Sequence, residues 1–187
     1  SDVCSSDLTT EDPLAEYEEV KPATNLKAPV SPTTVTDAQV AHGKYLVEIL
    51  GCSSCHTHGA ITGTPDKTLR LAGSRVGIAY SNPLADIHPA VAYPPNLTPD
   101  DETGIGRWSI PDVVSALRHG LATDGKRLLN VMPWPAYVRL SDSDATDIAH
   151  YLKSLPPVSH QVPGNVPQGR RAPEPFVYFG VYRGRES

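Results

Sequence analysis

Two cysteines and a histidine that could hold a cofactor stand together in the run GCSSCH, residues 51–56. Cys52 and Cys55 are three positions apart, and His56 directly follows the second thiol. Two thiols at this spacing can each add to one vinyl group of a haem, and the adjacent imidazole then lies under the iron. The motif predicts one covalent haem c, attached through Cys52 and Cys55, with His56 as an axial iron ligand.

Zinc binding, a redox-active dithiol and chance stay open as alternatives for this motif. A zinc site would need two further ligands, and the sequence holds no second C-x-x-C and no H-x3–5-H. A thioredoxin-like dithiol is expected between a strand and a helix, whereas this pair follows a predicted helix and opens a long loop. The haem interpretation is therefore favoured over all three.

A candidate for the second axial ligand is Met132, the only methionine of the chain. It stands in the proline-rich run MPWPAY, which stiffens the loop around a weak thioether ligand. The alternatives are a core methionine, an open site, or a distal histidine, for which His88 is the best runner-up. The remaining histidines are interpreted as surface, helix-end or loop residues: His42, His58, His119, His150 and His160.

Three amphipathic helices are predicted to position these residues. The first begins at Thr36, whose pairing with Gln39 matches a capping box, and it ends at Gly51, just before the cysteines. Its predicted apolar face is Ala41, Tyr45 and Ile49, with Leu46 and Leu50 beside them.

The second and third helices carry similar start and stop signals. Ser109 caps the second, and Gly120 ends it. The third begins at Ser141, with Asp144 completing a second capping box, and the pair Pro156-Pro157 terminates it. Their predicted apolar faces are Val113, Val114, Leu117 and Leu121, then Ala145, Ile148, Ala149, Leu152 and Leu155.

The composition suggests that a cofactor completes the core. The chain has 187 residues with 19 Pro and 14 Gly, and only 6% of its residues are aromatic. Long stretches with little periodicity separate the helices, and such loops are usually functional or wrapped around something. We therefore expect an all-α domain whose loops wrap one buried haem and whose haem-free form is largely unfolded.

Four segments are distinguished along the chain. Residues 1–8, which include the lone Cys4, resemble a translated sequencing adapter and are interpreted as non-native. Residues 9–35 are an acidic, flexible arm, and residues 36–157 form the haem domain. Residues 158–187 form a Pro-, Gly- and Arg-rich tail, whose apolar run FVYFGVY (176–182) is expected to pack on its own domain rather than on a partner's sheet edge.

The distribution of charged and apolar residues along the sequence argues against some classes of function. The net charge is -5, and no basic stripe suggests nucleic acid. No run of eighteen apolar residues suggests a membrane span, and no signal peptide is visible. Because covalent haem attachment takes place in an oxidising compartment, we expect a periplasmic or otherwise extracytoplasmic protein.

The chain resembles the class I cytochrome c family from about Thr36 to Pro157. The residues that carry the resemblance are Gly43, Tyr45-Leu46, GCSSCH, Met132-Pro133 and Tyr151-Leu152. The resemblance implies that the first and last helices cross, with Gly43 packed against Tyr151. It also implies a haem held by His56 and Met132.

A closer resemblance joins three runs to the haem domains of bacterial alcohol and gluconate dehydrogenase cytochrome subunits. The runs are NLTPDDETGIGRWS (96–109), MPWPAY (132–137) and LSDSDATDIAHYLKSLPPV (140–158). By analogy, Asn96, Thr98 and Trp108 would lie near the haem edge or its propionates; otherwise they form a turn and core. Those subunits usually carry several C-x-x-C-H motifs and this sequence has one, which indicates a single-haem relative.

The expected function is one-electron transfer rather than catalysis, because two axial ligands leave no position for a substrate. The donor would be a periplasmic or membrane-bound dehydrogenase or reductase, and the acceptor an oxidase or another cytochrome. Two alternatives stay open: a haem enzyme or gas sensor with an open distal site, and a fixed relay subunit of a dehydrogenase complex. The acidic arm could select a basic partner or keep the protein soluble.

Overall fold

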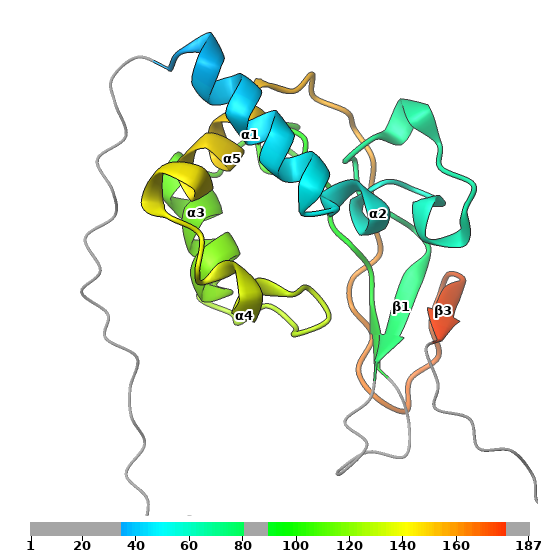
Figure 1. The fold of residues 1–187 in the computed structure, drawn as a ribbon. Coiled ribbons are helices and arrows are strands. Elements are labelled where there is room, and N and C mark those ends of the chain that lie inside the picture. The colour runs from blue at the N-terminus through cyan, green and yellow to red at the C-terminus, as the bar shows by residue number, and fades with distance from the viewer. Residues whose placement is uncertain (1–34, 81–89, 179–187) are drawn as a thin grey trace, which may run out of the picture.

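The computed structural model describes residues 35–80 and 90–178. The predicted adapter-like segment, nearly all of the acidic arm, His88 and the end of the tail lie outside the described residues. Figure 1 shows α1 (Asp37–Ile49), α3 (Ile110–His119), α4 (Trp134–Tyr137) and α5 (Asp142–Ser154) gathered on one side. The short α2 (Cys52–His56) and the strands lie on the other side.

The crossing of α1 and α5 is built on a glycine. A Cβ atom at Gly43 would come within 1.9 Å of the Asp147 carbonyl oxygen and 2.9 Å of the Tyr151 Cβ. Only a residue without a side chain allows this approach, so the predicted meeting of Gly43 and Tyr151 is confirmed.

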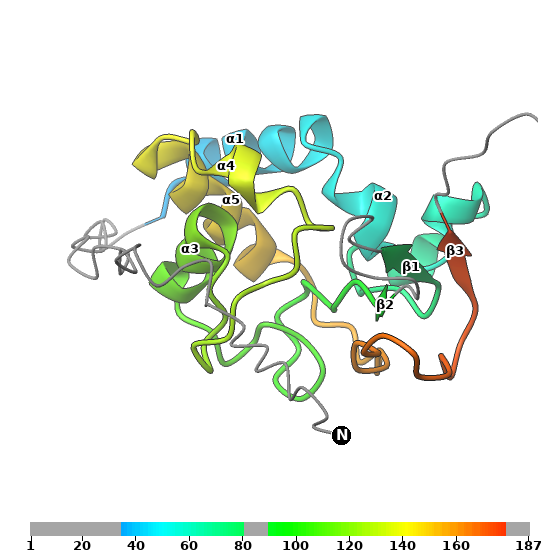
Figure 2. The same cartoon turned by 90° about the horizontal axis from the view of Figure 1, so that it is seen from below.

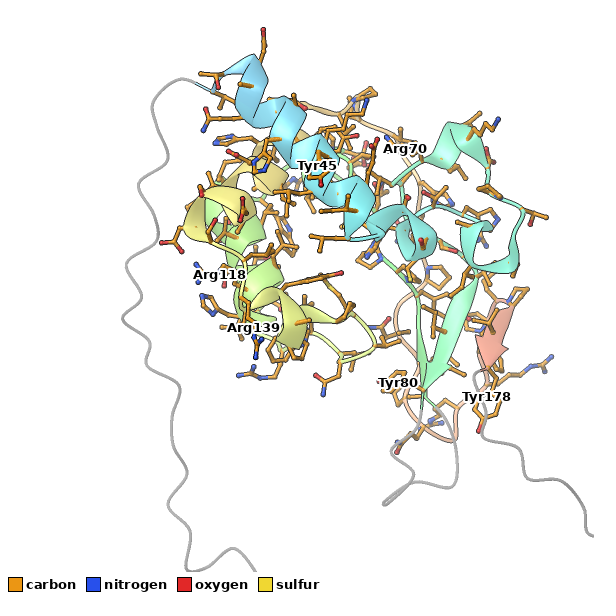
Figure 3. All side chains as sticks on the ribbon, in the orientation of Figure 1. Tyr45, Arg70, Tyr80, Arg118, Arg139 and Tyr178 are labelled. Atoms are coloured by element: carbon orange, nitrogen blue, oxygen red, sulfur yellow. The ribbon has the colours of Figure 1, made fainter. Side chains whose placement is uncertain are left out.

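The predicted apolar face of α1 is right for Leu46, which is buried, and for Leu50, which packs against the main core, but it is wrong for the other three residues, Ala41, Tyr45 and Ile49. Tyr45 and Ile49 are 57% and 58% exposed, while the buried residues are Gly43, Leu46 and Val47. Two apolar rows run along this helix, and periodicity cannot choose between them. The choice depends on Gly43, which no hydrophobicity pattern counts as a core residue. Tyr45 stands out from α1 in Figure 3.

The capping predictions hold with one exception. Thr36 and Gln39 form the full capping box of α1, and Ser109 forms one with Asp112 at α3. At α5, Ser141 accepts a hydrogen bond from the Asp144 amide, but the return bond of the predicted box is not made. The Asp144 carboxylate instead lies 3.8 Å from the His42 ring.

A small sheet accompanies the helices, which the all-α prediction did not include. Its order is β2-β1-β3, with β1 (Gly77–Tyr80) antiparallel to β2 (Ala90–Ala92) and parallel to β3 (Phe176–Tyr178). In Figures 1 and 2 the tail leaves α5, runs past β2 and reaches β1. Residues 176–178 therefore pair with the chain's own sheet through their backbone, but the side chains of Phe176 and Tyr178 stay 46% and 51% exposed, so the predicted packing holds only for the backbone.

The apolar interior is divided in two. The main core joins α1, α3 and α5, and a smaller cluster lies under the sheet around Val91 and Tyr93. Two short 3-10 turns, η1 (Ala60–Thr62) and η2 (Lys67–Leu69), lie in the loop that joins α2 to β1. Among the described residues, no helix has the length and apolar character needed to cross a membrane.

Candidate haem site

The thiols of Cys52 and Cys55 are carried by α2, which starts directly after Gly51. Gly51 has a φ of 69°, a left-handed conformation that suits glycine, and this lets α2 follow α1 with a sharp turn. Residues three positions apart share one face of a helix, so both thiols lie on the same side of α2. Both cysteines are free and only partly buried.

Burial raises the pKa of the Cys52 thiol to about 11 and also raises that of Cys55. Both groups are therefore neutral thiols near pH 7. A redox-active dithiol needs an accessible thiolate, which a raised pKa disfavours. No group of three or more metal-binding side chains occurs in the part of the chain that the structure describes. These findings weigh against a zinc site and against a redox-active dithiol.

His56 is buried at the end of α2 and held by one hydrogen bond. Its Nδ1 lies 2.8 Å from the carbonyl oxygen of Pro95, and a carbonyl oxygen can only accept a hydrogen bond. The ring therefore donates from Nδ1, which leaves the lone pair on Nε2. Burial lowers the pKa of His56, so the neutral form is favoured. A neutral imidazole anchored in this way is suited to bind a metal through Nε2.

Met132 and Cys52 border the same apolar cluster. Both are partly buried and pack against the main core, as do Leu97, Trp108 and Tyr137. The Met132 loop is short and tied: the Met132 amide donates to Leu129 O at 3.1 Å, and the Trp134 amide donates to Met132 O at 2.8 Å. The structure thus places the thioether and a thiol against the same apolar cluster.

Tyr137 is a site residue that sequence reasoning missed. Burial, and then the charges of Cys52 and Cys55, raise the pKa of its phenol to about 12. Tyr137 is the last residue of α4, so α4 places the Tyr137 phenol near the two thiols. The only sequence signal was its place five residues after Met132.

The structure places Asn96 and Thr98 in a buried hydrogen-bond network. Asn96 donates to Val158 O at 2.8 Å and to Thr103 Oγ1 at 3.0 Å, and its Oδ1 accepts from the Thr98 amide and hydroxyl. Trp108 is partly buried against the main core. Their predicted place near a haem edge stays a prediction, and the network gives Asn96 and Thr98 a structural task as well.

The structure changes the interpretation of one histidine, His150. His150 is 7% exposed, and its Nε2 has no hydrogen-bond partner among the described residues, so its interpretation as a surface or edge residue is wrong. His150 is one of the buried residues of α5. The pattern of polar residues in the sequence does not show that this histidine is buried. His42 is exposed but bonded to Asp147 at 2.9 Å. His160 donates to Ala72 O at 2.8 Å and lies edge-on to His58.

These residues fit a haem c. Two free thiols share a helix face, a neutral imidazole presents Nε2, and a thioether and aromatic rings adjoin the same apolar cluster.

Comparison with known sequences agrees with this geometry. The sequence model for cytochrome c matches residues 40–156. The chain belongs to the cytochrome c family. Family membership implies electron transfer by a covalent haem c, and the resemblance seen in the sequence is confirmed.

Several relatives of this cytochrome are dehydrogenase subunits. It is 36% identical to the fructose dehydrogenase cytochrome subunit of Gluconobacter japonicus, over 69% of this chain and 24% of that protein. It is 34% identical to the cytochrome c subunit of the quinone alcohol dehydrogenase of Gluconobacter oxydans, over 67% of this chain and 23% of the relative. It is 36% identical to the gluconate 2-dehydrogenase cytochrome c subunit of Pantoea cypripedii, over 66% and 25%. The chain spans about a quarter of the length of these relatives.

Proposed function

We propose that this chain carries single electrons through one haem c with His56 and Met132 as axial ligands. Cys52 and Cys55 would form the two thioether links. The observation that supports the proposal most is the hydrogen bond from His56 Nδ1 to Pro95 O, which leaves Nε2 free beside two thiols on one helix. The single C-x-x-C-H motif of this sequence supports one haem.

Each protein group has a distinct task in this proposal. A bound haem c supplies the one-electron cycling of its iron. The two cysteines fix its position, and His56 keeps its tautomer through Pro95 O. Met132 would supply the second iron ligand, and its thioether would raise the reduction potential relative to a second nitrogen ligand.

The proposed partners are redox proteins outside the cytoplasm. The relatives are named as subunits of fructose, alcohol and gluconate dehydrogenases. We therefore propose a dehydrogenase as electron donor and an oxidase or another cytochrome as acceptor, in the periplasm or an equivalent compartment. The same names favour a second candidate, a relay held permanently in one complex, which would be recovered with a stable partner on purification.

The test is expression in a host that attaches haem c. We expect a c-type reduced spectrum that survives acid–acetone extraction, one haem per chain, and little response to carbon monoxide. The Cys52→Ala/Cys55→Ala variant should release its haem and lose most of its helical circular dichroism. Ser53→Ala and Ser54→Ala, which change the two residues between the cysteines, are the matched controls. A folded wild-type chain without covalent haem would overturn the proposal.

A further inference from the structure

The carbonyl of Pro95 that holds His56 belongs to a segment tied on both sides. The Ser74 amide donates to Pro94 O at 2.9 Å, and the Leu97 amide donates to Leu71 O at 2.8 Å. Pro95 itself is exposed, so its own side chain does little to fix the direction of the carbonyl. The position of Pro95 O therefore depends on its neighbours.

Asn96, the next residue, links Pro95 to the chain beyond α5. It is 2% exposed, and both hydrogens of its amide nitrogen are used, toward Val158 O and Thr103 Oγ1. The Thr103 hydroxyl also accepts from the His160 amide at 3.0 Å. The peptide after Pro95 is thus anchored to residues 158–160, which lie beyond the part of the chain that matches the cytochrome c family.

Gly73 forms a second connection between the tail and Pro95. Its φ is +85°, and a Cβ atom there would lie 2.6 Å from Val162 Cγ2 and 2.8 Å from the carbonyl carbon of Pro95. The Gly73 amide donates to His56 O at 2.8 Å. Gly73 therefore packs against both the tail and Pro95, and its amide also holds the His56 main chain.

The far end of the same tail is fastened to the sheet. Val91 and Val166 exchange two backbone hydrogen bonds, of 3.0 and 2.8 Å. The Tyr93 hydroxyl donates to Glu174 O at 2.8 Å, and β3 then pairs with β1. We call residues 158–178 the strap. It is anchored at both ends, and Figure 2 shows it as the orange segment that runs from α5 past β2 to β3.

We propose that the strap, through Asn96, holds the Pro95 carbonyl against His56 Nδ1 and thereby lowers the reduction potential of the haem. This inference rests on the proposed function, in which His56 binds the iron. A well-placed acceptor makes the imidazole a stronger donor to the metal, which favours the ferric state. Asn96 is accordingly a positioning residue, whose amide hydrogens are already committed within the protein.

The test compares Asn96→Ala with the haem-loaded wild-type protein. We expect the midpoint potential to rise and the His56 Nδ1 proton, followed by its shifted NMR signal in the ferric protein, to exchange faster with solvent. Thr103→Val removes the hydroxyl shared by Asn96 and His160, and should act in the same direction with a milder loss of stability. It keeps the test informative if Asn96→Ala does not fold.

The control is Asp147→Asn, which weakens the bond to His42 at the α1–α5 crossing, away from Pro95. It should lower Tm and leave the potential and the proton exchange unchanged. If Asn96→Ala and Thr103→Val lower Tm but leave both quantities at the wild-type values, the inference is overturned and the network is only structural. A wild-type protein without covalent haem, or without a His56 signal shifted by the iron, would instead show that the proposed function has failed.

Discussion

At the scale of single residues, Met132 decides between a sealed electron-transfer site and an open one. Met132→Ala removes the only methionine of the chain. We expect loss of the far-red band of a methionine–iron bond, a lower reduction potential, and ready binding of carbon monoxide. Absorption spectra and a redox titration measure these changes.

Leu129→Ala is the matched control for Met132, since it alters the same loop without removing sulfur. It should keep the far-red band and bind little carbon monoxide. Strong carbon monoxide binding by the wild-type protein would contradict ligation by Met132, and would favour the enzyme or sensor alternative.

Tyr137 gives the site a pH dependence on the alkaline side. Its phenol has a pKa of about 12 in the folded chain against an ordinary value of 10.0, chiefly because of burial. Between these values the unfolded chain has lost the proton while the folded chain keeps it, so stability falls as pH rises from about 10 through 12. In haem-loaded protein the cysteines are thioethers, and burial remains the cause.

The variant Tyr137→Phe should remove that part of the alkaline loss. The measurement is Tm at several pH values from 9 to 12 for both haem-loaded proteins. The difference in Tm between the wild type and the variant should be constant below pH 10. Above pH 10, the Tm of the variant should fall less than that of the wild type. Parallel curves over the whole range would show that Tyr137 is not buried as described.

At the scale of elements, the α1–α5 crossing sets two physical effects against each other. Helix propensity alone makes Gly→Ala stabilising by roughly 0.5–1 kcal/mol. At Gly43, however, the added methyl group would meet the Asp147 carbonyl at 1.9 Å. We expect Gly43→Ala to destabilise by about 1–3 kcal/mol or more, as for other overpacked cores. Denaturant unfolding of the haem-loaded protein measures this.

The exposed position Ala41 on the same helix supplies the control for Gly43. Ala41→Gly should lose only the propensity term, roughly 0.5–1 kcal/mol. A Gly43→Ala variant as stable as the wild type would mean that the helices do not cross this closely.

The elements also show what the sequence could predict. Caps are local, so Thr36, Ser109 and Gly120 correctly bound their helices. Periodicity wrongly placed Tyr45 and Ile49 on the buried face of α1, because the contact depends on Gly43, whose contribution is an absent side chain. The family resemblance, by contrast, placed Gly43 correctly at the crossing. Strand β3 has only three residues and pairs with β1, about a hundred positions earlier. No local sequence pattern could therefore predict it.

Some residues of the candidate site could likewise be predicted from the sequence, and others could not. The side chains of Cys52, Cys55, His56 and Met132 carry chemical signatures, and the sequence singled them out. The partner of His56 is a main-chain carbonyl, which has no signature in the sequence. Asn96 was picked by resemblance, but its partners come from Thr103 and from the tail at Val158, which only the folded chain brings together.

At the scale of the whole molecule, positive and negative side chains are concentrated in different stretches of a domain whose net charge is near zero. The stretch around Met132, from residue 113 to 140, carries Arg118, Lys126, Arg127 and Arg139 against one acid, Asp124. The stretch from 99 to 112 instead carries four acids and one base. Figure 3 shows Arg118 and Arg139 on the same side of α3 and α4.

The arginines of this region differ in how free their charges are. Arg118 is paired with Asp142, so its charge is largely compensated. The guanidinium of Arg127 lies 5.4 Å from the Trp134 ring centre, which orients it without neutralising it. Arg139 is exposed. A positive potential beside the Met132 loop should attract anions and repel cations.

Small redox reagents test this potential without a known partner. The reduced protein should be oxidised faster by hexacyanoferrate(III), an anion, as ionic strength falls, and more slowly by a cationic cobalt complex. Arg139→Gln should weaken both trends, and the difference should fade above about 0.1 M salt, where the Debye length is about 10 Å. Arg170→Gln, in the strap, is the matched control and should leave both rates near wild type. Because both variants lose one positive charge, an equal effect would assign the salt dependence to net charge, whereas an effect of Arg139 alone would place the electron-transfer surface beside Met132.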